Sequence, residues 1–353
     1  MEINHTSPAS SDSVQDFDRD LHIEFLQMMY NILPPPYENQ EINRLTLAYF
    51  TISGLSLLGS LNRVDKECVA SWVLSFQNHP RNEAELTNGQ FYGFSGSRSS
   101  QFQSAENSVE SLNCSHLAST YCAIAILKII DYDLSSIDCQ SIIRSMKNLQ
   151  QPDGCFMPIH TGAEKDLRFV YCAASICSML EDWSGMDIEK AKNYIVDCQS
   201  YDGGFGLIPG LESHGGATYC AVASLHLMGF IKEDILLKDP SSCVINVQLL
   251  LDWSLQRQAN DGGFQGRLNK PSDTCYAFWI GGVLRMLGSH RFINEKALQQ
   301  FLLTCQSKYG GFSKFPRNFP DLYHSYYGFC SISMLEEADT NPINVELGIP
   351  ATR

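Results

Sequence analysis

The sequence predicts an all-α protein, an α/α toroid of repeated helix pairs around a central apolar cavity. Three observations predict this fold. A turn motif recurs at Gln150, Gln199, Gln258 and Gln306, 48 to 59 residues apart, which suits a helix-turn-helix unit with its connections. A short Tyr-Cys-Ala element or a relative of it accompanies the turns. No useful length of chain alternates with the period of two that a half-buried strand requires.

The turn motif is rich in glycine, and glycine pairs of this kind end helices and form turns. We call these four segments the repeat turns. They read Gln150-Gln-Pro-Asp-Gly-Cys-Phe156, Gln199-Ser-Tyr-Asp-Gly-Gly-Phe205, Gln258-Ala-Asn-Asp-Gly-Gly-Phe264 and Gln306-Ser-Lys-Tyr-Gly-Gly-Phe312.

Two kinds of helix lie between the turns. Segments such as 217–228 and 276–287 are apolar nearly all round, which is typical of buried inner helices. Segments such as 188–198 and 294–305 are more mixed and predict an outer layer. Five or six such pairs can stack as an open solenoid or close into a toroid, and periodicity alone does not choose. The many aromatic and small residues of the inner segments favour closure.

The chain divides into one large domain and two short tails. Residues 1–17 contain several serines without apolar periodicity and predict a disordered tail. A single toroid domain is expected over 18–345, followed by a tail over 346–353.

Composition excludes several classes of function. The 353 residues are 44% hydrophobic, ample for a large core. A net charge of −14 opposes nucleic-acid binding. No apolar stretch approaches the length of a membrane span and no secretory signal is evident, so a cytoplasmic location is expected. The 13 cysteines lack the close pairing of a disulfide framework, which predicts mostly reduced core residues.

Polar residues recur 15 to 18 positions after the glutamine of each repeat turn. Equivalent offsets in neighbouring repeats place such side chains on one rim of a toroid, near the N-termini of inner helices. That rim is the predicted active site. Its polar residues are Asp166, Arg168, His214, Asp273, Cys275 and His324.

Three of these rim residues suit a metal ion. Asp273, Cys275 and His324 offer a carboxylate, a thiolate and an imidazole, a ligand set that suits Zn²⁺. Three protein ligands leave a fourth position open, which is typical of a catalytic zinc site. The Asp-x-Cys spacing is weak by itself, and the shared repeat offset supports the interpretation.

A second group suits a polyanion such as a diphosphate. Arginine and lysine donors beside helix N-termini stabilise phosphate oxygens. The candidate residues are His214, Arg267, Lys270, Tyr276 and Lys314.

A third group is apolar and predicts a tunnel for a long hydrocarbon, although core packing alone is the alternative interpretation. Its members on the inner segments are Phe50, Tyr171, Tyr219, Cys220, Trp279 and Tyr327.

Three segments together resemble the signature segments of protein prenyltransferase β subunits. They are Leu211-Glu-Ser-His-Gly-Gly-Ala-Thr-Tyr-Cys220, Gly266-Arg-Leu-Asn-Lys-Pro-Ser-Asp-Thr-Cys-Tyr-Ala-Phe-Trp279 and Asp321-Leu-Tyr-His-Ser-Tyr-Tyr-Gly328. The resemblance runs from about residue 20 to 345. It implies an α/α toroid that acts as an obligate heterodimer with a helical-repeat α subunit.

The resemblance also implies roles for individual residues. Asp273, Cys275 and His324 match the zinc ligands of the family. The positions that hold the diphosphate are matched by His214, Arg267, Lys270 and Tyr276. The positions that line the isoprenoid tunnel are matched by Arg168, Tyr171, Cys220 and Trp279. The implied reaction is alkylation of a zinc-bound thiolate of the acceptor protein, with the α subunit adding a further lysine.

Two positions indicate the type I geranylgeranyltransferases within this family. Thr46, four residues before Phe50, falls where farnesyltransferases carry a tryptophan that closes the tunnel, and a small residue leaves room for a fourth isoprene. Lys314 falls where the other two classes look acidic, which implies that Mg²⁺ is not required. The expected donor is geranylgeranyl diphosphate. The expected acceptors are proteins ending in Cys-a-a-X, with X often leucine, such as small GTPases.

Two residues depart from the type I pattern. Tyr323 and Tyr327 stand where type I enzymes carry leucine and phenylalanine and farnesyltransferases carry tyrosines, so selectivity for the last acceptor residue is expected to be relaxed. The first alternative is a farnesyltransferase β subunit. A terpene cyclase shares the toroid, but its Asp-x-Asp-Asp and Asp-Asp-x-x-Asp motifs do not occur in the chain. A non-catalytic helical scaffold, which predicts no bound metal, is the last alternative.

Overall fold

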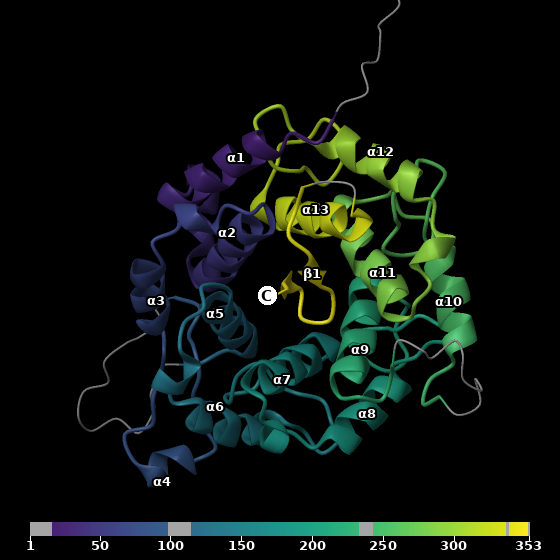
Figure 1. Cartoon of the computed structure of the whole chain (residues 1–353). Coiled ribbons are helices and arrows are strands. Elements are labelled where there is room, and N and C mark those ends of the chain that lie inside the picture. Colours follow the sequence, from purple (N-terminus) through teal and green to yellow (C-terminus); the bar gives the residue numbers. More distant parts are fainter. Residues whose placement is uncertain (1–15, 98–113, 233–242, 337–338, 352–353) are drawn as a thin grey trace, which may run out of the picture.

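Two concentric layers of helices form a ring around a central axis (Figure 1). The computed structural model describes residues 16–97, 114–232, 243–336 and 339–351. The inner helices are α2 (Arg44–Leu57), α5 (Leu117–Ile129), α7 (Leu167–Leu180), α9 (Gly215–Leu227), α11 (Thr274–Met286) and α13 (Leu322–Leu335). The outer helices are α1 (Arg19–Asn31), α3 (Lys66–Leu74), α6 (Cys139–Met146), α8 (Ile188–Asp197), α10 (Val247–Leu255) and α12 (Glu295–Cys305).

The inner helices form a closed ring. Each of them packs against the next in chain order, and α13 packs against α2 to complete the circle. Their burial follows the predicted division into layers: every residue of α5 is buried except Ala118 and Lys128, whereas α8 buries only Ala191, Tyr194 and Ile195. The predicted all-α toroid is confirmed, and the open solenoid is excluded.

The remaining elements are short. One further helix, α4 (Glu83–Leu86), and a 3-10 segment, η1 (Pro35–Asn43), belong to the first repeats. Single 3-10 turns are η2 (Leu61–Arg63), η3 (Leu134–Ser136), η4 (Lys147–Leu149), η5 (Trp183–Gly185) and η8 (His290–Phe292). Among the described helices, none combines the length and the apolar character needed to cross a membrane.

Each repeat turn connects two neighbouring outer helices through its glutamine side chain. Gln199 donates from Nε2 to the carbonyl of Asn246 at 3.1 Å and accepts from the Asn246 N–H at 2.9 Å, and Asn246 caps α10. Gln150 and Gln258 make the same pair of bonds to the caps of α8 and α12. The glutamine and the phenylalanine of each turn also pair as an antiparallel bridge. The motif that revealed the repeat is therefore the element that joins its units.

The first glycine of the turn is required by a close approach between backbones. Gly203 has a φ of 97°, which disfavours any residue with a Cβ. A Cβ there would lie 2.2 Å from the backbone carbon of Leu249 on α10. Gly262 has the same relationship to Ala297 on α12, with a contact of 2.2 Å to its carbonyl oxygen. The next outer helix thus packs directly on the backbone of each turn.

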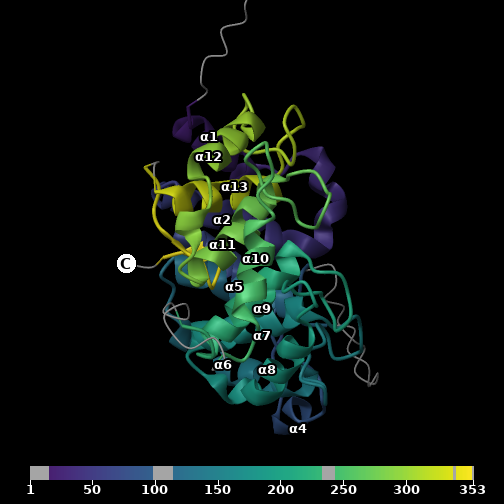
Figure 2. The same ribbon diagram turned by 90° about the vertical axis from the view of Figure 1, so that its right-hand side faces the viewer.

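The C-terminal residues form a hairpin inside the ring (Figure 1). Strand β1 (Ile343–Asn344) pairs antiparallel with β2 (Ile349–Pro350), and Leu347 and Ile349 are buried. The prediction of a tail over 346–353 is therefore wrong for residues 346–351. The side view in Figure 2 places this hairpin at one face of the ring and the loops that precede the inner helices at the other.

Tyrosine hydroxyls of the inner helices hold the hairpin in place. Tyr121 donates to Leu347 O at 2.6 Å, Tyr219 to Val345 O at 2.8 Å and Tyr326 to Gly348 O at 2.5 Å. Tyr49 also donates to Gly348 O. The tyrosines of the repeated Tyr-Cys-Ala element therefore satisfy backbone carbonyls that would otherwise be buried without partners.

At the other end of the chain, the prediction of a tail over 1–17 is wrong for residues 16 and 17. Phe17 packs against the core and its ring lies 4.9 Å from that of His22. The carbonyl of Asp16 accepts a hydrogen bond from Gln306 Nε2 at 3.0 Å. Residues 1–15 lie outside the described residues.

All 13 cysteines are free and nine of them are buried, as predicted from their spacing.

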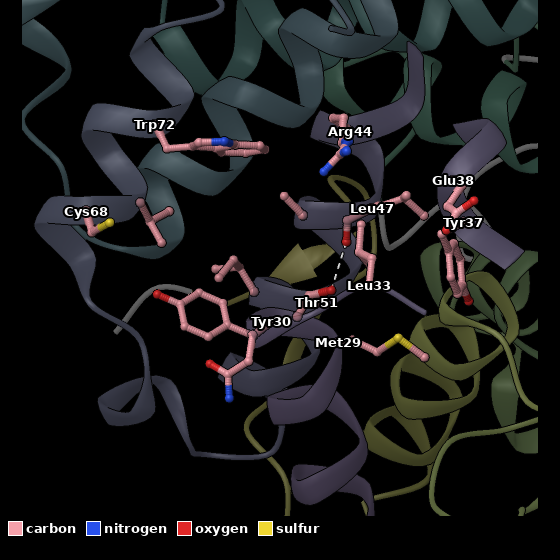
Figure 3. Close-up of a pocket in the computed structure, with 14 residues that line it drawn as sticks. Met29, Tyr30, Leu33, Tyr37, Glu38, Arg44, Leu47, Thr51, Cys68 and Trp72 are labelled. Atoms are coloured by element: carbon pink, nitrogen blue, oxygen red, sulfur yellow. Dashed lines mark hydrogen bonds between the residues drawn. The ribbon is translucent and has the colours of Figure 1, made fainter. Parts of the chain in front are cut away.

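A groove separates the outer helices α1 and α3 and exposes the outward face of α2 between them (Figure 3). Its volume is about 420 Å³. We call it the α3 groove. Among the residues that line it are Met29, Leu33, Leu47, Thr51, Cys68 and Trp72.

Candidate active site

Polar residues cap the N-termini of the inner helices at one rim of the ring. Each capping side chain accepts a hydrogen bond from a backbone N–H two or three residues further on. Helix N-termini carry partial positive charge and favour anions. The structure thus places the predicted rim residues at the N-termini of the inner helices, and their role as an active site stays a prediction. The capping residues are His116, Asp166, His214, Asp273 and Asp321.

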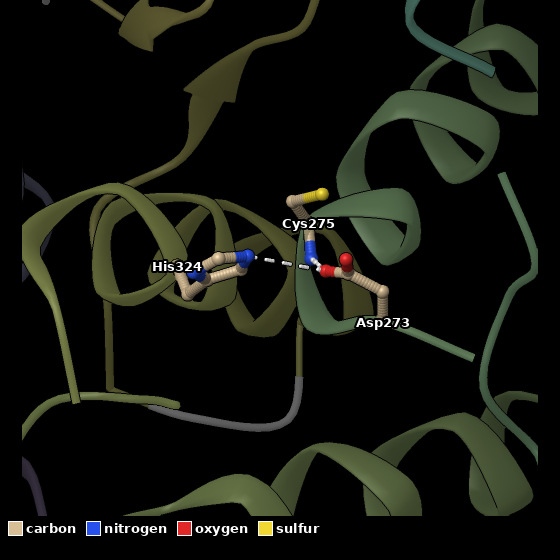
Figure 4. Close-up of side chains that lie close together, drawn as sticks. All are labelled: Asp273, Cys275 and His324. Carbon is tan, nitrogen blue, oxygen red and sulfur yellow. Dashed lines mark hydrogen bonds and ion pairs between the residues drawn. The ribbon is translucent and has the colours of Figure 1, made fainter. Parts of the chain in front are cut away.

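Three side chains from two adjacent inner helices converge on a candidate metal centre (Figure 4). The ligand atoms of Asp273, Cys275 and His324 all lie within 4.8 Å of one another. Asp273 Oδ1 is 3.3 Å from His324 Nε2 and also accepts from the Cys275 N–H at 3.0 Å. The three residues predicted as zinc ligands are thus brought together by the packing of α11 against α13.

A fourth residue, Asp321, orients the histidine of this centre. Its Oδ2 lies 2.7 Å from His324 Nδ1, and its Oδ1 accepts from the His324 N–H at 2.8 Å. Because Nδ1 is held by Asp321, Nε2 is the ring nitrogen that faces Asp273 and is left to ligate a metal ion. Carboxylate partners of this kind fix the ring and the tautomer of metal-ligating histidines. Sequence reasoning missed Asp321, although its Asp-x-x-His spacing at a helix N-terminus was a usable signal.

The electrostatics of the centre favour a cation. Burial and the adjacent Asp273 carboxylate raise the pKa of the Cys275 thiol well above its usual value. Burial alone would lower the pKa of His324, but its bonds to Asp273 and Asp321 raise the pKa to about 9. Asp273 keeps a lowered pKa because hydrogen bonds from His324 and Cys275 outweigh its own burial. A buried cluster with this much acidic character suits a divalent cation that the thiol can bind as a thiolate.

Lys314 lies beside the centre, with Nζ 3.7 Å from Asp273 Oδ2. Its backbone is held there by Thr274, whose N–H donates to Lys314 O at 3.2 Å and whose hydroxyl donates to Ser313 O at 2.7 Å. The side chain itself is about half exposed, at 49%. Lys314 can therefore present a positive charge to a ligand bound at the rim.

His214 and Tyr276 form a direct pair on the same rim. His214 Nδ1 accepts from the Gly216 N–H at 3.1 Å, so Nε2 carries the proton and donates to the Tyr276 hydroxyl at 3.0 Å. Burial and the charge of Arg267 lower the pKa of His214. The tyrosine hydroxyl proton is left free to donate to an anion. Gly266 makes this pair possible, since a Cβ there would lie 2.0 Å from the Tyr276 ring.

The other basic residues predicted for the site are Arg168, Arg267 and Lys270. Arg267 is half-buried and lies 3.2 Å from Glu212, and Lys270 is exposed. Arg168 pairs with its own helix cap, Asp166, at 2.6 Å and with Glu164 at 2.9 Å. The structure thus places all three on the rim loops or the first turn of an inner helix, and two of them are partnered by carboxylates.

An aromatic belt runs round the inside of the toroid and touches all six inner helices. Successive ring centroids lie 4.2 to 5.9 Å apart. Its members are Tyr49, Tyr121, Tyr171, Tyr219, Trp279, Tyr327 and Phe50. Five of the six predicted apolar residues therefore belong to one connected set of rings: Phe50, Tyr171, Tyr219, Trp279 and Tyr327.

Two smaller residues adjoin this belt. Thr46 on α2 is half-buried, and its hydroxyl lies 3.7 Å from the Cys122 sulfur on α5. Cys220 on α9 is buried, with 8% exposure. Burial raises the pKa of Cys220 to about 12 and that of Cys122 to about 12 as well. Both thiols are therefore uncharged at neutral pH and pack as small apolar side chains.

His116 is a second rim residue that sequence reasoning missed. It caps α5 through Nδ1, which accepts from the Ala118 N–H at 3.1 Å, so its Nε2 carries a proton. Its ring lies 5.9 Å from that of Phe169 on α7. The signal was present in the sequence, because a serine precedes His116 as it precedes His214 and Asp273. The repeat turn before His116 is interrupted, which concealed the equivalence.

The fold is thus an α/α toroid with a candidate metal centre at one rim and an aromatic belt inside the ring. Residues 17–349 match the family described as the prenyltransferase alpha-alpha toroid domain. The chain belongs to this prenyltransferase family.

Similar proteins agree with this membership. The β subunit of geranylgeranyl transferase type 1 from Arabidopsis thaliana is 64% identical over 98% of this chain and 92% of its own length. The subunit of the same name from Dictyostelium discoideum is 36% identical over 88% of each chain. A solved structure described as Candida albicans protein geranylgeranyltransferase-I complexed with GGPP superposes with a TM-score of 0.79 and 25% identity, over 94% of this chain and 95% of the other.

Proposed function

We propose that this chain is the catalytic β subunit of a type I protein geranylgeranyltransferase. It transfers a geranylgeranyl group from geranylgeranyl diphosphate to the cysteine of a C-terminal Cys-a-a-X motif. The observation that carries the proposal is the convergence of Asp273, Cys275 and His324 beside a rim of anion-binding groups and an aromatic belt. A non-catalytic scaffold has no use for this combination.

The centre would hold Zn²⁺ through one oxygen, one sulfur and one nitrogen ligand. This donor set fits zinc, and three protein ligands are the number found in catalytic zinc sites. Zinc bound there supplies a lower pKa for an acceptor thiol and a fixed position for the thiolate. Asp321 keeps His324 in the ligating tautomer, and the burial of Asp273 and Cys275 limits the access of water to the centre.

The rim would hold the diphosphate of the donor. Tyr276 offers its hydroxyl proton, and Arg267 and Lys270 lie on the loop that precedes its helix, α11. Lys314 approaches from the side of the metal centre. These donors neutralise the negative charge that develops on the leaving diphosphate as its bond to the isoprenoid C1 breaks.

The aromatic belt would hold the isoprenoid chain, with Arg168, Tyr171, Cys220 and Trp279 along its length. Thr46 and Phe50 border it on α2. The small side chain of Thr46 leaves room for a fourth isoprene, whose burial contributes about 4 kcal/mol at roughly 0.8 kcal/mol per carbon. This size argument favours the C20 donor over the C15 donor.

Farnesyltransferase is the second candidate, because Tyr323 and Tyr327 stand where farnesyltransferases carry tyrosines. Tyr323 lies on the side of the belt that faces the metal centre. Its hydroxyl accepts from Trp279 Nε1 at 3.2 Å, and its ring lies 4.9 Å from that of Tyr327. We expect these two tyrosines to relax selectivity for the last acceptor residue. Coexpression with a prenyltransferase α subunit, followed by assay with geranylgeranyl and farnesyl diphosphate, tests the assignment. A higher kcat/KM for the C15 donor would reassign the chain as a farnesyltransferase subunit.

A further inference from the structure

Helix α3, which borders the α3 groove, differs from the other outer helices. Within the described residues, no turn of the preceding repeat packs on it. On four other outer helices a repeat turn approaches the third residue after the helix cap. Gly154 lies against Lys190 of α8, and Gly310 lies against Leu21 of α1. The second turn glycine approaches the aromatic residue seven positions after the cap: Gly204 lies against Trp253 and Gly263 against Phe301.

The remaining outer helix, α6, is also covered by the chain that precedes it. Ser145 lies seven residues after the cap Asp138, and its hydroxyl accepts from the Tyr92 N–H at 3.0 Å. Gln77 and Phe94 form the bridge that defines a repeat turn, with extra residues inserted between them. Five of the six outer helices therefore receive a turn of the preceding repeat, four of them at the third residue after the cap and α6 at the seventh.

The equivalent positions of α3 line the α3 groove. Its cap is Asp65, so the third and seventh residues are Cys68 and Trp72, and both face the groove (Figure 3). Cys68 is the most exposed of the cysteines. No described residue of this chain therefore covers the face of α3 that corresponds to the turn-binding face of the other outer helices.

The cause lies in the sequence that follows α1. Where a repeat turn is expected, the chain reads Ile32-Leu33-Pro34-Pro35-Pro36 and continues as η1. Proline fixes φ near −65° and has no N–H, so it can neither take the positive φ of the turn glycine nor donate to the bridge. The chain passes the groove instead of filling it.

The surroundings of the groove favour a protein partner. Ile32 and Ile42, which lie on the two segments that border it, are 76% and 71% exposed. The mouth carries both signs of charge, since Arg44 pairs with Glu41 at 2.8 Å and Glu38 lies nearby. A second copy of the chain is disfavoured because each copy carries a net charge of −14.

We propose that the α3 groove is a docking site for the partner subunit of the heterodimer. It takes a turn of that subunit, with a small residue against Cys68 and an apolar side chain beneath Trp72, as the repeat turns do on the other outer helices. The inference rests on the proposed function, because that function supplies the partner. The groove lies on the outward face of α2, so docking there leaves the aromatic belt free.

The native thiol of Cys68 provides the first test. Its alkylation rate by a maleimide is measured by mass spectrometry in the free chain and in the heterodimer with a prenyltransferase α subunit. We expect protection of at least about tenfold in the heterodimer. The matched control is Glu67→Cys in a Cys68→Ser background, because Glu67 is exposed on the same helix and does not line the groove. Equal reactivity of Cys68 in both states would overturn the proposal.

A pair of tryptophan variants provides the second test. Cys68→Trp fills the groove and is expected to weaken subunit association about tenfold or more, while Glu67→Trp leaves it unchanged. Thermal unfolding of each free chain shows whether the variant folds, and kcat at saturating partner is expected to equal that of the wild type. Tight association of Cys68→Trp with full activity would refute the docking site and leave the proposed function intact. Self-association of the wild-type chain through this face would also refute the docking site. Failure of the wild-type chain to bind any α subunit would refute both the docking site and the proposed function.

Discussion

His22 and Gln306 are 284 positions apart in the sequence and meet through a hydrogen bond of 2.9 Å that closes the ring. His22 Nδ1 also accepts from the Gly311 N–H at 2.8 Å, so its Nε2 is the donor to Gln306 Oε1. The same oxygen accepts from the N–H of Asp18, the cap of α1. The last repeat turn thus binds the first outer helix as the other turns bind their neighbours.

Acidification is expected to destabilise the protein through His22. Burial lowers the pKa of His22 from 6.5 to about 4. A lowered folded-state pKa means that the stabilisation is present above pH 6.5 and is lost as pH falls from 6.5 towards 4, by about 3 kcal/mol. Urea unfolding from pH 7 to pH 4 measures it. His22→Gln should show a smaller loss over this interval, with exposed His79→Gln as the control. A parallel loss in both variants would contradict the role of His22.

Metal content should depend on Cys275. We expect one zinc per chain in the wild type and little in Cys275→Ala, because a two-ligand site is too weak to retain the ion. Transfer should be abolished, while binding of the isoprenoid diphosphate, measured by fluorescence titration, stays close to the wild-type value. Cys139→Ala, on the outer helix α6, is the control. Full activity in a metal-free Cys275→Ala enzyme would sink the zinc assignment.

Asp321 is expected to act through His324, separately from its role as a helix cap. Asp321→Asn keeps an oxygen that can accept from the His324 N–H but replaces the carboxylate at Nδ1. Zinc affinity, measured by competition with a chelator, should fall about 10-fold to 100-fold, with little change in thermal stability. Asp187→Asn, at the cap of α8, is the matched control. If Asp321→Asn binds zinc as tightly as the wild type, the carboxylate does not orient the ligand.

The repeat was predictable because its turns carry a side-chain signal. The glutamine and glycines of a repeat turn are required by bonds and contacts that recur in each unit, as at Gln199 and Gly203. The rim followed from the same offsets. These offsets also predicted Asp273, Cys275 and His324 as neighbours, and the packing of α11 against α13 brings the three together.

Other features were hidden from sequence because backbone atoms or interrupted repeats create them. The C-terminal hairpin is recognised by tyrosine hydroxyls through its carbonyls, which leave no mark on the sequence of residues 343–351. The closing contact of Gln306 with α1 was concealed because the first unit lacks a repeat turn. The pairing of Arg267 with Glu212 depends on loop geometry that no periodicity encodes.

Donor length should be controlled at Thr46. The hydroxyl of Thr46 lies 3.7 Å from the Cys122 sulfur on the neighbouring inner helix. In the proposed binding mode, an indole at position 46 takes the space of the fourth isoprene. Thr46→Trp is expected to shift kcat/KM from the C20 towards the C15 donor by about 1 to 3 kcal/mol, roughly 5-fold to 150-fold. Thr46→Ser is the control and should keep the wild-type ratio. An unchanged ratio in Thr46→Trp would show that residue 46 does not border the end of the isoprenoid chain.

Lys314 should make added magnesium unnecessary. Its ammonium lies 3.7 Å from the Asp273 carboxylate and is half exposed, so it can face both the metal centre and a diphosphate on the rim. A lysine there neutralises charge on the leaving group, whereas an acidic residue would need Mg²⁺ to do so. Single-turnover rates with and without millimolar Mg²⁺ should be equal in the wild type. Lys314→Asp should be slower, on the order of 100-fold, and partly rescued by Mg²⁺.

The control for this prediction is Lys308→Asp, which makes the same charge change at an exposed lysine of the preceding turn. It should transfer at the wild-type rate without added Mg²⁺. If Lys308→Asp lost as much transfer rate as Lys314→Asp, the effect would come from the overall electrostatic field of the protein and not from a contact at the rim. Strong magnesium dependence of the wild type would refute the role of Lys314, and it would favour the farnesyltransferase assignment that Tyr323 and Tyr327 already support.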